Sequence, residues 1–162
     1  MHTKKLAYSA LLCAVAIIFG YIESLLPLPI PIPGIKLGIS NLVLLFVLCK
    51  DKRLAWGIML VKVMLTSLLF SGMTAFFYAL AGGILSMLVM TILFSTQKFS
   101  IISVSMAGGI FHNLGQLCAA CILLINIKAV YWLPFLALAG AVAGTILGVV
   151  CCILLERLPW RL

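Results

Sequence analysis

Seven polar or ionisable side chains stand in or beside long apolar runs of this 162-residue chain. They are Glu23, Lys36, Asn41, Lys62, His112, Asn113 and Gln116. An ionisable group near the centre of a bilayer costs roughly 2.5 kcal/mol or more, so such groups usually face the interior of a helix bundle. Lysine attracts anions, whereas imidazole and amide groups donate and accept hydrogen bonds. The set therefore predicts a binding site for a small molecule that is anionic or amphipathic.

The residues needed for catalysis are sparse. The three acidic residues, Glu23, Asp51 and Glu156, are far apart in the sequence, so no carboxylate pair is available to hold a metal ion. No phosphate-binding glycine loop and no serine triad can be found either. The motif Cys118-x-x-Cys121 lacks a second ligand pair, and we interpret it as apolar packing. We expect a protein that is not an enzyme and that needs no cofactor and no metal.

The composition predicts the elements that must position these residues. With 65% hydrophobic residues, 9% charged residues and a mean hydropathy of +1.34, the chain is typical of an all-α polytopic membrane protein. We expect one integral membrane domain over 1–162, whose first apolar run is a retained helix. The predicted bundle has six transmembrane helices, at 6–26, 35–49, 54–71, 74–94, 100–125 and 132–155. The second is short, because fifteen helical residues extend only about 22 Å.

The basic residues predict an orientation. Eight of them fall at one set of span ends, and only Lys36 and Lys128 fall at the other. The eight are Lys4, Lys5, Lys50, Lys52, Arg53, Lys98, Arg157 and Arg161. Since basic loops stay in the cytoplasm, we expect both termini there, in the inner or plasma membrane of a bacterium. This distribution accounts for the net charge of +8 without a nucleic-acid partner.

On this orientation the polar residues form a funnel that opens outward. Lys62, His112 and Gln116 fall near the middle of the membrane, while Glu23 and Lys36 fall near the outer surface. The alternating prolines of 27–33 predict an extended strap, which is either a lid over the funnel or a rigid connector. Each polar residue also has a structural interpretation: Glu23, Lys36 and Lys62 could snorkel to water, and the amides and His112 could form an interhelical network.

Small residues predict close helix contacts. Gly140, Gly144 and Gly148 recur every four residues in the last span, and Ala10 and Ala14, extended by Ala7, do so in the first. The pattern alone leaves open whether the glycine stripe serves a contact within the bundle or with a partner.

Three segments carry a resemblance to a known family. They are 33–43 (PGIKLGISNLV), 80–86 (LAGGILS) and 107–117 (AGGIFHNLGQL). The chain resembles, over essentially its whole length, the Gx transporter family, also labelled heptaprenyl diphosphate synthase component I. That family is similar in size and layout to the S components of energy-coupling factor (ECF) transporters, which capture a micronutrient outside the cell.

The resemblance implies an S-component-like bundle with partners in the membrane. Ala7, Ala10 and Ala14 would dock on a transmembrane coupling subunit, which two cytoplasmic ATPases drive. An alternative is a non-catalytic membrane accessory of a prenyl diphosphate synthase, or of a quinone or flavin electron-transfer system. Prenyl chain elongation itself needs aspartate-rich motifs, and this chain has one aspartate.

Overall fold

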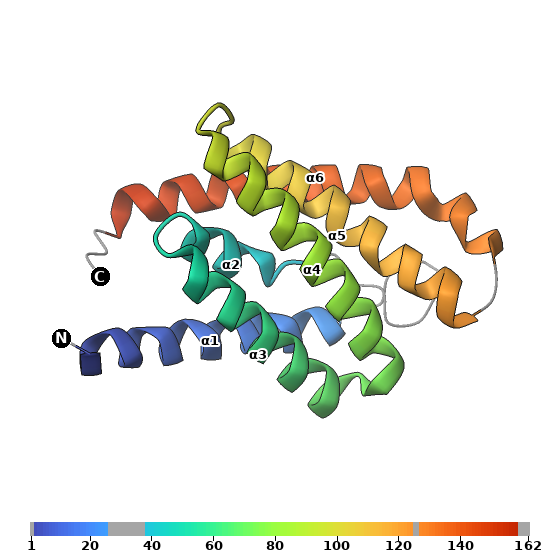
Figure 1. Ribbon diagram of the computed structural model, residues 1–162, viewed down its shortest axis with the longest axis horizontal. Helices are drawn as coiled ribbons and strands as arrows, with labels where there is room; N and C mark the ends of the chain where they lie inside the picture. Colours follow the sequence, from blue (N-terminus) through green and yellow to red (C-terminus); the bar gives the residue numbers. More distant parts are fainter. Residues whose placement is uncertain (1, 26–37, 125–126, 159–162) are drawn as a thin grey trace.

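The apolar runs of the sequence form a bundle of helices (Figure 1). The structure is a computed structural model that describes residues 2–25, 38–124 and 127–158, and within these ranges it contains helices and no strand. The helices are α1 (His2–Leu25), α2 (Asn41–Leu48), α3 (Lys52–Phe70), α4 (Gly72–Thr96), α5 (Ile101–Leu124), the 3-10 helix η1 (Ile127–Trp132) and α6 (Leu133–Arg157).

Five of the described helical segments are long and apolar enough to cross a membrane, namely those of α1, α3, α4, α5 and α6. The expected count of six spanning helices is not confirmed. In the described part of the predicted second span, only the eight residues of α2 are helical, and they extend about 12 Å. The described parts of the other spans agree with the prediction to within about four residues.

The central position of α2 explains why its sequence resembles a transmembrane helix. Figure 1 shows α2 in the middle of the bundle, and seven of its eight residues are buried. Leu44, Leu45 and Leu48 pack in one core with Met59 of α3 and Met87 of α4. A short helix surrounded by other helices is apolar all round, as a lipid-facing helix would be. The hydrophobicity of α2 therefore serves the core of the protein.

Local signals set the helix ends. Asp51 caps α3, because its carboxylate accepts hydrogen bonds from the backbone amides of Arg53 (3.0 Å) and Leu54 (3.1 Å). Gly72 begins α4 with a φ of 82°, directly after Ser71 ends α3, and Gln97 ends α4 in the left-handed region with a φ of 56°.

The glycine stripe of α6 is used inside the bundle. A Cβ atom on Gly140 would lie 2.5 Å from the carbonyl oxygen of Gly109 in α5, and one on Gly144 would lie 2.5 Å from that of Ser105. A Cβ atom on Gly148 would lie 2.8 Å from the Cα atom of Ile102 in α5. The backbones of α5 and α6 can approach this closely only because side chains are missing at the contact. The sequence left open whether this stripe contacts the bundle or a partner. In the structure it forms a contact within the bundle.

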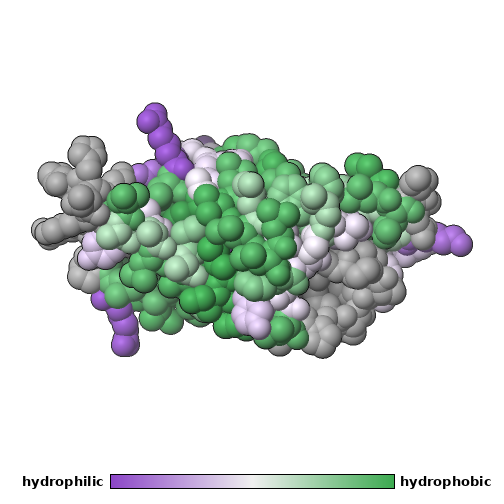
Figure 2. Space-filling model, turned by 90° about the horizontal axis from the view of Figure 1, so that it is seen from below, coloured by the Kyte–Doolittle hydropathy of each residue, from purple (hydrophilic) through white to green (hydrophobic). Residues whose placement is uncertain are grey.

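The start of α1 and the end of α6 lie at the same end of the bundle, and the connection between α2 and α3 lies there too (Figure 1). The face seen in Figure 2 is mostly hydrophobic across its middle, and strongly hydrophilic residues protrude toward its two ends. Many large apolar side chains of the described helices are exposed, including Leu69, Ile92 and Leu138. This distribution is that of a membrane protein, whose middle faces lipid.

Candidate functional site

Glu23, near the end of α1, binds the segment that leads into α2. Its carboxylate accepts hydrogen bonds from the backbone amides of Gly38 and Ile39, the latter at 3.2 Å, and from the Ser40 hydroxyl at 3.3 Å. The backbone amide of Asn41 donates to the carbonyl of Gly38 at 2.8 Å, which closes a turn; we call Gly38–Asn41 the α2 turn. Gly38 has a φ of 83°, a conformation that favours glycine. Glu23 therefore supplies acceptors to backbone donors outside any helix.

Lys62 of α3 and His112 and Gln116 of α5 lie in the same region of the bundle as Glu23. Together with Glu23 they line a cavity between α1, α3, α4 and α5, which we call the charged cavity. The complete lining is Gly20, Glu23, Ser40, Lys62, Thr66, Ala79, His112 and Gln116.

The charged cavity is small. The space between its atoms measures about 320 Å³ and is partly open to solvent, and about 20 Å³ of it can take the centre of a water-sized sphere. One or two water molecules would fill it, since one water needs roughly 10–15 Å³ by that measure. The described residues thus form a small cavity, and the predicted outward-opening funnel stays a prediction, because residues 26–37 lie outside the described part of the chain.

Two glycines let the helices bring these polar groups together. A Cβ atom on Gly82 of α4 would lie 2.7 Å from the His112 carbonyl oxygen and 2.8 Å from the Gln116 Cγ. A Cβ atom on Gly20 of α1 would lie 2.7 Å from the Thr66 Cγ2 of α3. Larger residues at these positions would push α4 or α1 away from the cavity.

The His112 side chain is buried with unused hydrogen-bonding capacity. Its ring is 4% exposed, and its Nδ1 atom has no hydrogen-bond partner among the described residues. A buried polar atom without a partner is costly, and in a native protein it usually indicates a bound water or a ligand. His112 is thus the residue of the charged cavity with the clearest capacity for a ligand.

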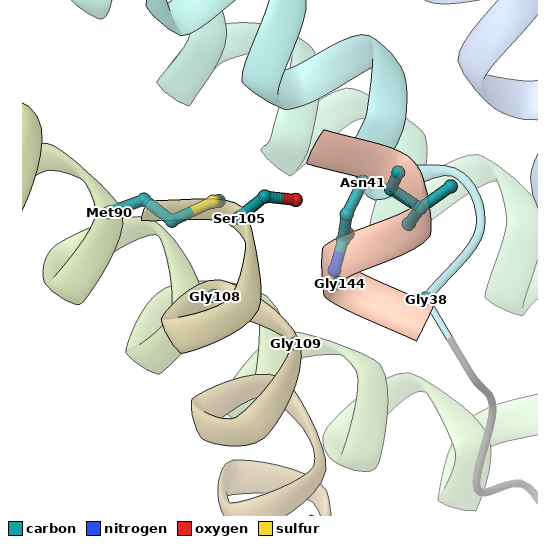
Figure 3. A pocket seen from close by; sticks show the side chains of 8 residues that line it. Gly38, Asn41, Met90, Ser105, Gly108, Gly109 and Gly144 are labelled. Carbon is teal, nitrogen blue, oxygen red and sulfur yellow. The ribbon is translucent and has the colours of Figure 1, made fainter. Parts of the chain in front are cut away.

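The structure separates two predicted site residues from the charged cavity. Asn113 follows His112 on α5 but faces α6, where its Nδ2 atom donates to the Leu136 carbonyl at 2.8 Å. It lines neither this cavity nor the next one described. Asn41 lines a second cavity, between the α2 turn, α4, α5 and α6 (Figure 3).

This second cavity contains no charged side chain among its described lining residues, and we call it the neutral cavity. It is lined by Gly38, Asn41, Met90, Ser105, Gly108, Gly109, Gly144 and Leu147. It encloses about 250 Å³ between its atoms, of which about 10 Å³ is open to the centre of a water-sized sphere. That is room for one water molecule.

Lys36 and the prolines of 27–33 lie outside the described residues, so their predicted roles stay predictions. The alanines predicted to contact a partner helix, Ala7, Ala10 and Ala14, are exposed on α1. Among the described residues no group of three or more His, Cys, Asp or Glu side chains could hold a metal ion.

Comparison with known proteins gives one match. The profile of the family described as heptaprenyl diphosphate synthase component I matches residues 12–154, which is most of the chain. The chain belongs to this family. A search of characterised proteins and a search of solved structures each returned no match. For this member of the heptaprenyl diphosphate synthase component I family, the site must therefore be interpreted from its own geometry.

Several residues that line the two cavities were missing from the sequence prediction. Thr66 lies one turn after Lys62 on α3, and this spacing could have indicated a shared face. Ser105 lies two turns before His112 on α5, yet it lines the neutral cavity. Serine and threonine are common in membrane helices, where they often bond the backbone of the preceding turn, so their type alone gives no signal.

Proposed function

We propose that this membrane protein is the substrate-binding subunit, similar to an S component, of an ECF-type uptake transporter. The observation that carries the proposal is the convergence of Glu23, Lys62, His112 and Gln116, from three helices, on one cavity inside the bundle. Such polar groups are expensive within a membrane and usually mark a binding site or pathway. In this proposal the protein catalyses no reaction, and both termini lie in the cytoplasm of a bacterial cell.

The charges of the cavity support a small anionic or amphipathic substrate. Lys62 contributes a positive charge, and the Glu23 carboxylate is already bound by two backbone amides and a hydroxyl. His112 and Gln116 provide hydrogen-bonding groups that could orient the substrate. In this proposal an anionic group of the ligand lies beside Lys62, because a positive charge attracts an anion more strongly inside a membrane than in water.

The exposed alanines of α1 support the proposed partner. Ala7, Ala10 and Ala14 lie on the exterior of the bundle, where small side chains would allow a second helix to approach closely. In the proposed complex this face contacts a transmembrane coupling subunit, which cytoplasmic ATPases drive.

Native mass spectrometry of protein purified in a mild detergent tests the substrate site. We expect the wild-type protein to retain a small molecule and the variants Lys62→Ala and His112→Ala to lose it while staying folded by circular dichroism. Lys98→Ala is the control, because Lys98 is exposed between α4 and α5 and lies outside the cavity. Retention of the same molecule by both cavity variants would refute the site assignment.

The second candidate function is that of a membrane accessory to a prenyl diphosphate synthase or an electron-transfer system. The family description favours it, since it names a component of heptaprenyl diphosphate synthase. The segment 50–53 is the surface proposed to recruit a soluble partner. However, Asp51 caps α3, and the Lys52 ammonium donates to the Ser95 hydroxyl at 2.8 Å. Two side chains of segment 50–53 therefore already have structural contacts.

Co-purification distinguishes the two functions. A coupling subunit together with ATPases would support transport, and a soluble prenyl diphosphate synthase would support the accessory role.

A further inference from the structure

The α2 turn is the wall between the charged cavity and the neutral cavity. Ser40 lines the charged cavity, whereas Gly38 and Asn41 line the neutral cavity. The turn also packs on His112, because a Cβ atom on Gly38 would lie 3.2 Å from the His112 Cδ2. Four residues that belong mostly to no helix therefore separate two voids in the interior of the bundle.

Two buried polar side chains line the neutral cavity. Asn41 is 8% exposed and Ser105 is 6% exposed, and the two come from opposite sides of the cavity, the α2 turn and α5. Figure 3 shows the Ser105 hydroxyl pointing from α5 toward Asn41, and the Asn41 amide pointing toward Gly144. An amide and a hydroxyl that face one cavity can together donate hydrogen bonds to a bound polar group and accept hydrogen bonds from it.

Neither cavity alone has the size of a ligand site. By the volume that can take the centre of a water-sized sphere, each of these two cavities has room for only one or two water molecules, far less than the pockets of about 300–1,000 Å³ that usually hold small molecules. The helices around them are packed through glycines and cannot separate easily. The α2 turn is held differently, because among the described side chains the Glu23 carboxylate is the one that binds its backbone amides.

We propose that the two cavities are the two halves of one ligand site, joined when the α2 turn leaves Glu23. This inference rests on the proposed function, and it specifies the ligand further. The charged half binds the anionic group beside Lys62 and His112. The neutral half binds an uncharged group that can both donate and accept hydrogen bonds, such as a hydroxyl or an amide, between Asn41 and Ser105. The site thus selects an elongated molecule with its charge at one end.

Accessibility of a cysteine in the neutral cavity tests this inference. Ser105→Cys is treated with 2-(trimethylammonium)ethyl methanethiosulfonate, a charged reagent that reaches a buried thiol through water. Peptide mass spectrometry gives the labelling rate at each position, so the native cysteines can stay. We expect labelling to be at least about tenfold faster when Glu23→Ala is added, because losing one charge-assisted hydrogen bond shifts an opening equilibrium by about that factor.

Ser86→Cys is the matched control. Ser86 is 1% exposed on α4, its hydroxyl donates to the Gly108 carbonyl at 2.9 Å, and it lines neither cavity. Its labelling should be equally slow with and without Glu23→Ala. An equal increase at both cysteines would mean that the whole bundle has loosened, and it would overturn the inference. If Glu23→Ala does not fold, Glu23→Gln replaces it, and we expect a smaller increase confined to position 105.

The labelling experiment and the ligand-retention experiment can fail independently of each other. Equally slow labelling of Ser105→Cys in both backgrounds would overturn the joined site, even if Lys62→Ala still abolishes ligand retention. Conversely, retention of the ligand by Lys62→Ala and His112→Ala would refute the proposed function, whatever the labelling shows.

Discussion

Gly140→Ala should destabilise the protein by about 3 kcal/mol, through the contact between α5 and α6. The new Cβ atom would lie 2.5 Å from the carbonyl oxygen and 2.7 Å from the carbonyl carbon of Gly109. Both are backbone atoms, so the helices themselves must move, and overpacking of this kind costs about 1–3 kcal/mol. The same Cβ atom would lie 3.0 Å from the Asn113 Nδ2, whose hydrogen bond to Leu136 is worth about 1 kcal/mol.

Unfolding by sodium dodecyl sulfate in mixed micelles, followed by circular dichroism, measures the free energy difference. Gly57→Ala is the matched control, because Gly57 is exposed on α3 and a Cβ atom there would meet nothing within 4 Å. We expect this control to leave the stability unchanged or to raise it by up to about 1 kcal/mol, since alanine favours helix more than glycine does. Equal unfolding midpoints for Gly140→Ala and Gly57→Ala would refute the described packing of α5 on α6.

The same assay checks two further changes. Gly38→Ala should cost about 1–3 kcal/mol, because φ is 83° and the new Cβ atom would lie 2.8 Å from the Asn41 Nδ2; an unchanged midpoint would contradict the described α2 turn. Asp51→Ala should cost about 1 kcal/mol by removing the acceptor for the amides of Arg53 and Leu54, and Asp51→Asn should recover most of it; failure of the asparagine variant to do so would argue against a capping role.

The helices could largely be predicted from the sequence, because a run of about 20 apolar residues has few stable arrangements other than a membrane helix. The second predicted span shows the limit of this reasoning. Leu44, Leu45 and Leu48 are as apolar as lipid-facing residues, but they face the core formed by Met59 and Met87. The mean hydropathy of a sequence segment measures how strongly its residues prefer an apolar environment. It cannot distinguish lipid from the protein interior.

The candidate site could be predicted in part, for a geometric reason. His112 and Gln116 are one helical turn apart, and both line the charged cavity, as the spacing indicates. Asn113 is adjacent in sequence but lies about 100° further around the helix, which turns it toward Leu136. The role of Glu23 could not be predicted, because its partners are backbone amides of the α2 turn, and backbone amides carry no signal in the residue types.

The membrane-length helices of the described chain do not by themselves explain where the two chain ends lie. Five membrane-length helices are an odd number, which would leave the two ends on opposite sides, yet the start of α1 and the end of α6 lie together (Figure 1). Between α1 and α3 the described chain contains α2, which is about 12 Å long, and the α2 turn, which belongs mostly to no helix. Unwound backbone at membrane depth is tolerated only where protein groups satisfy its hydrogen bonds. Glu23 supplies such acceptors to the backbone amides of Gly38 and Ile39, in the place that water takes at a protein surface.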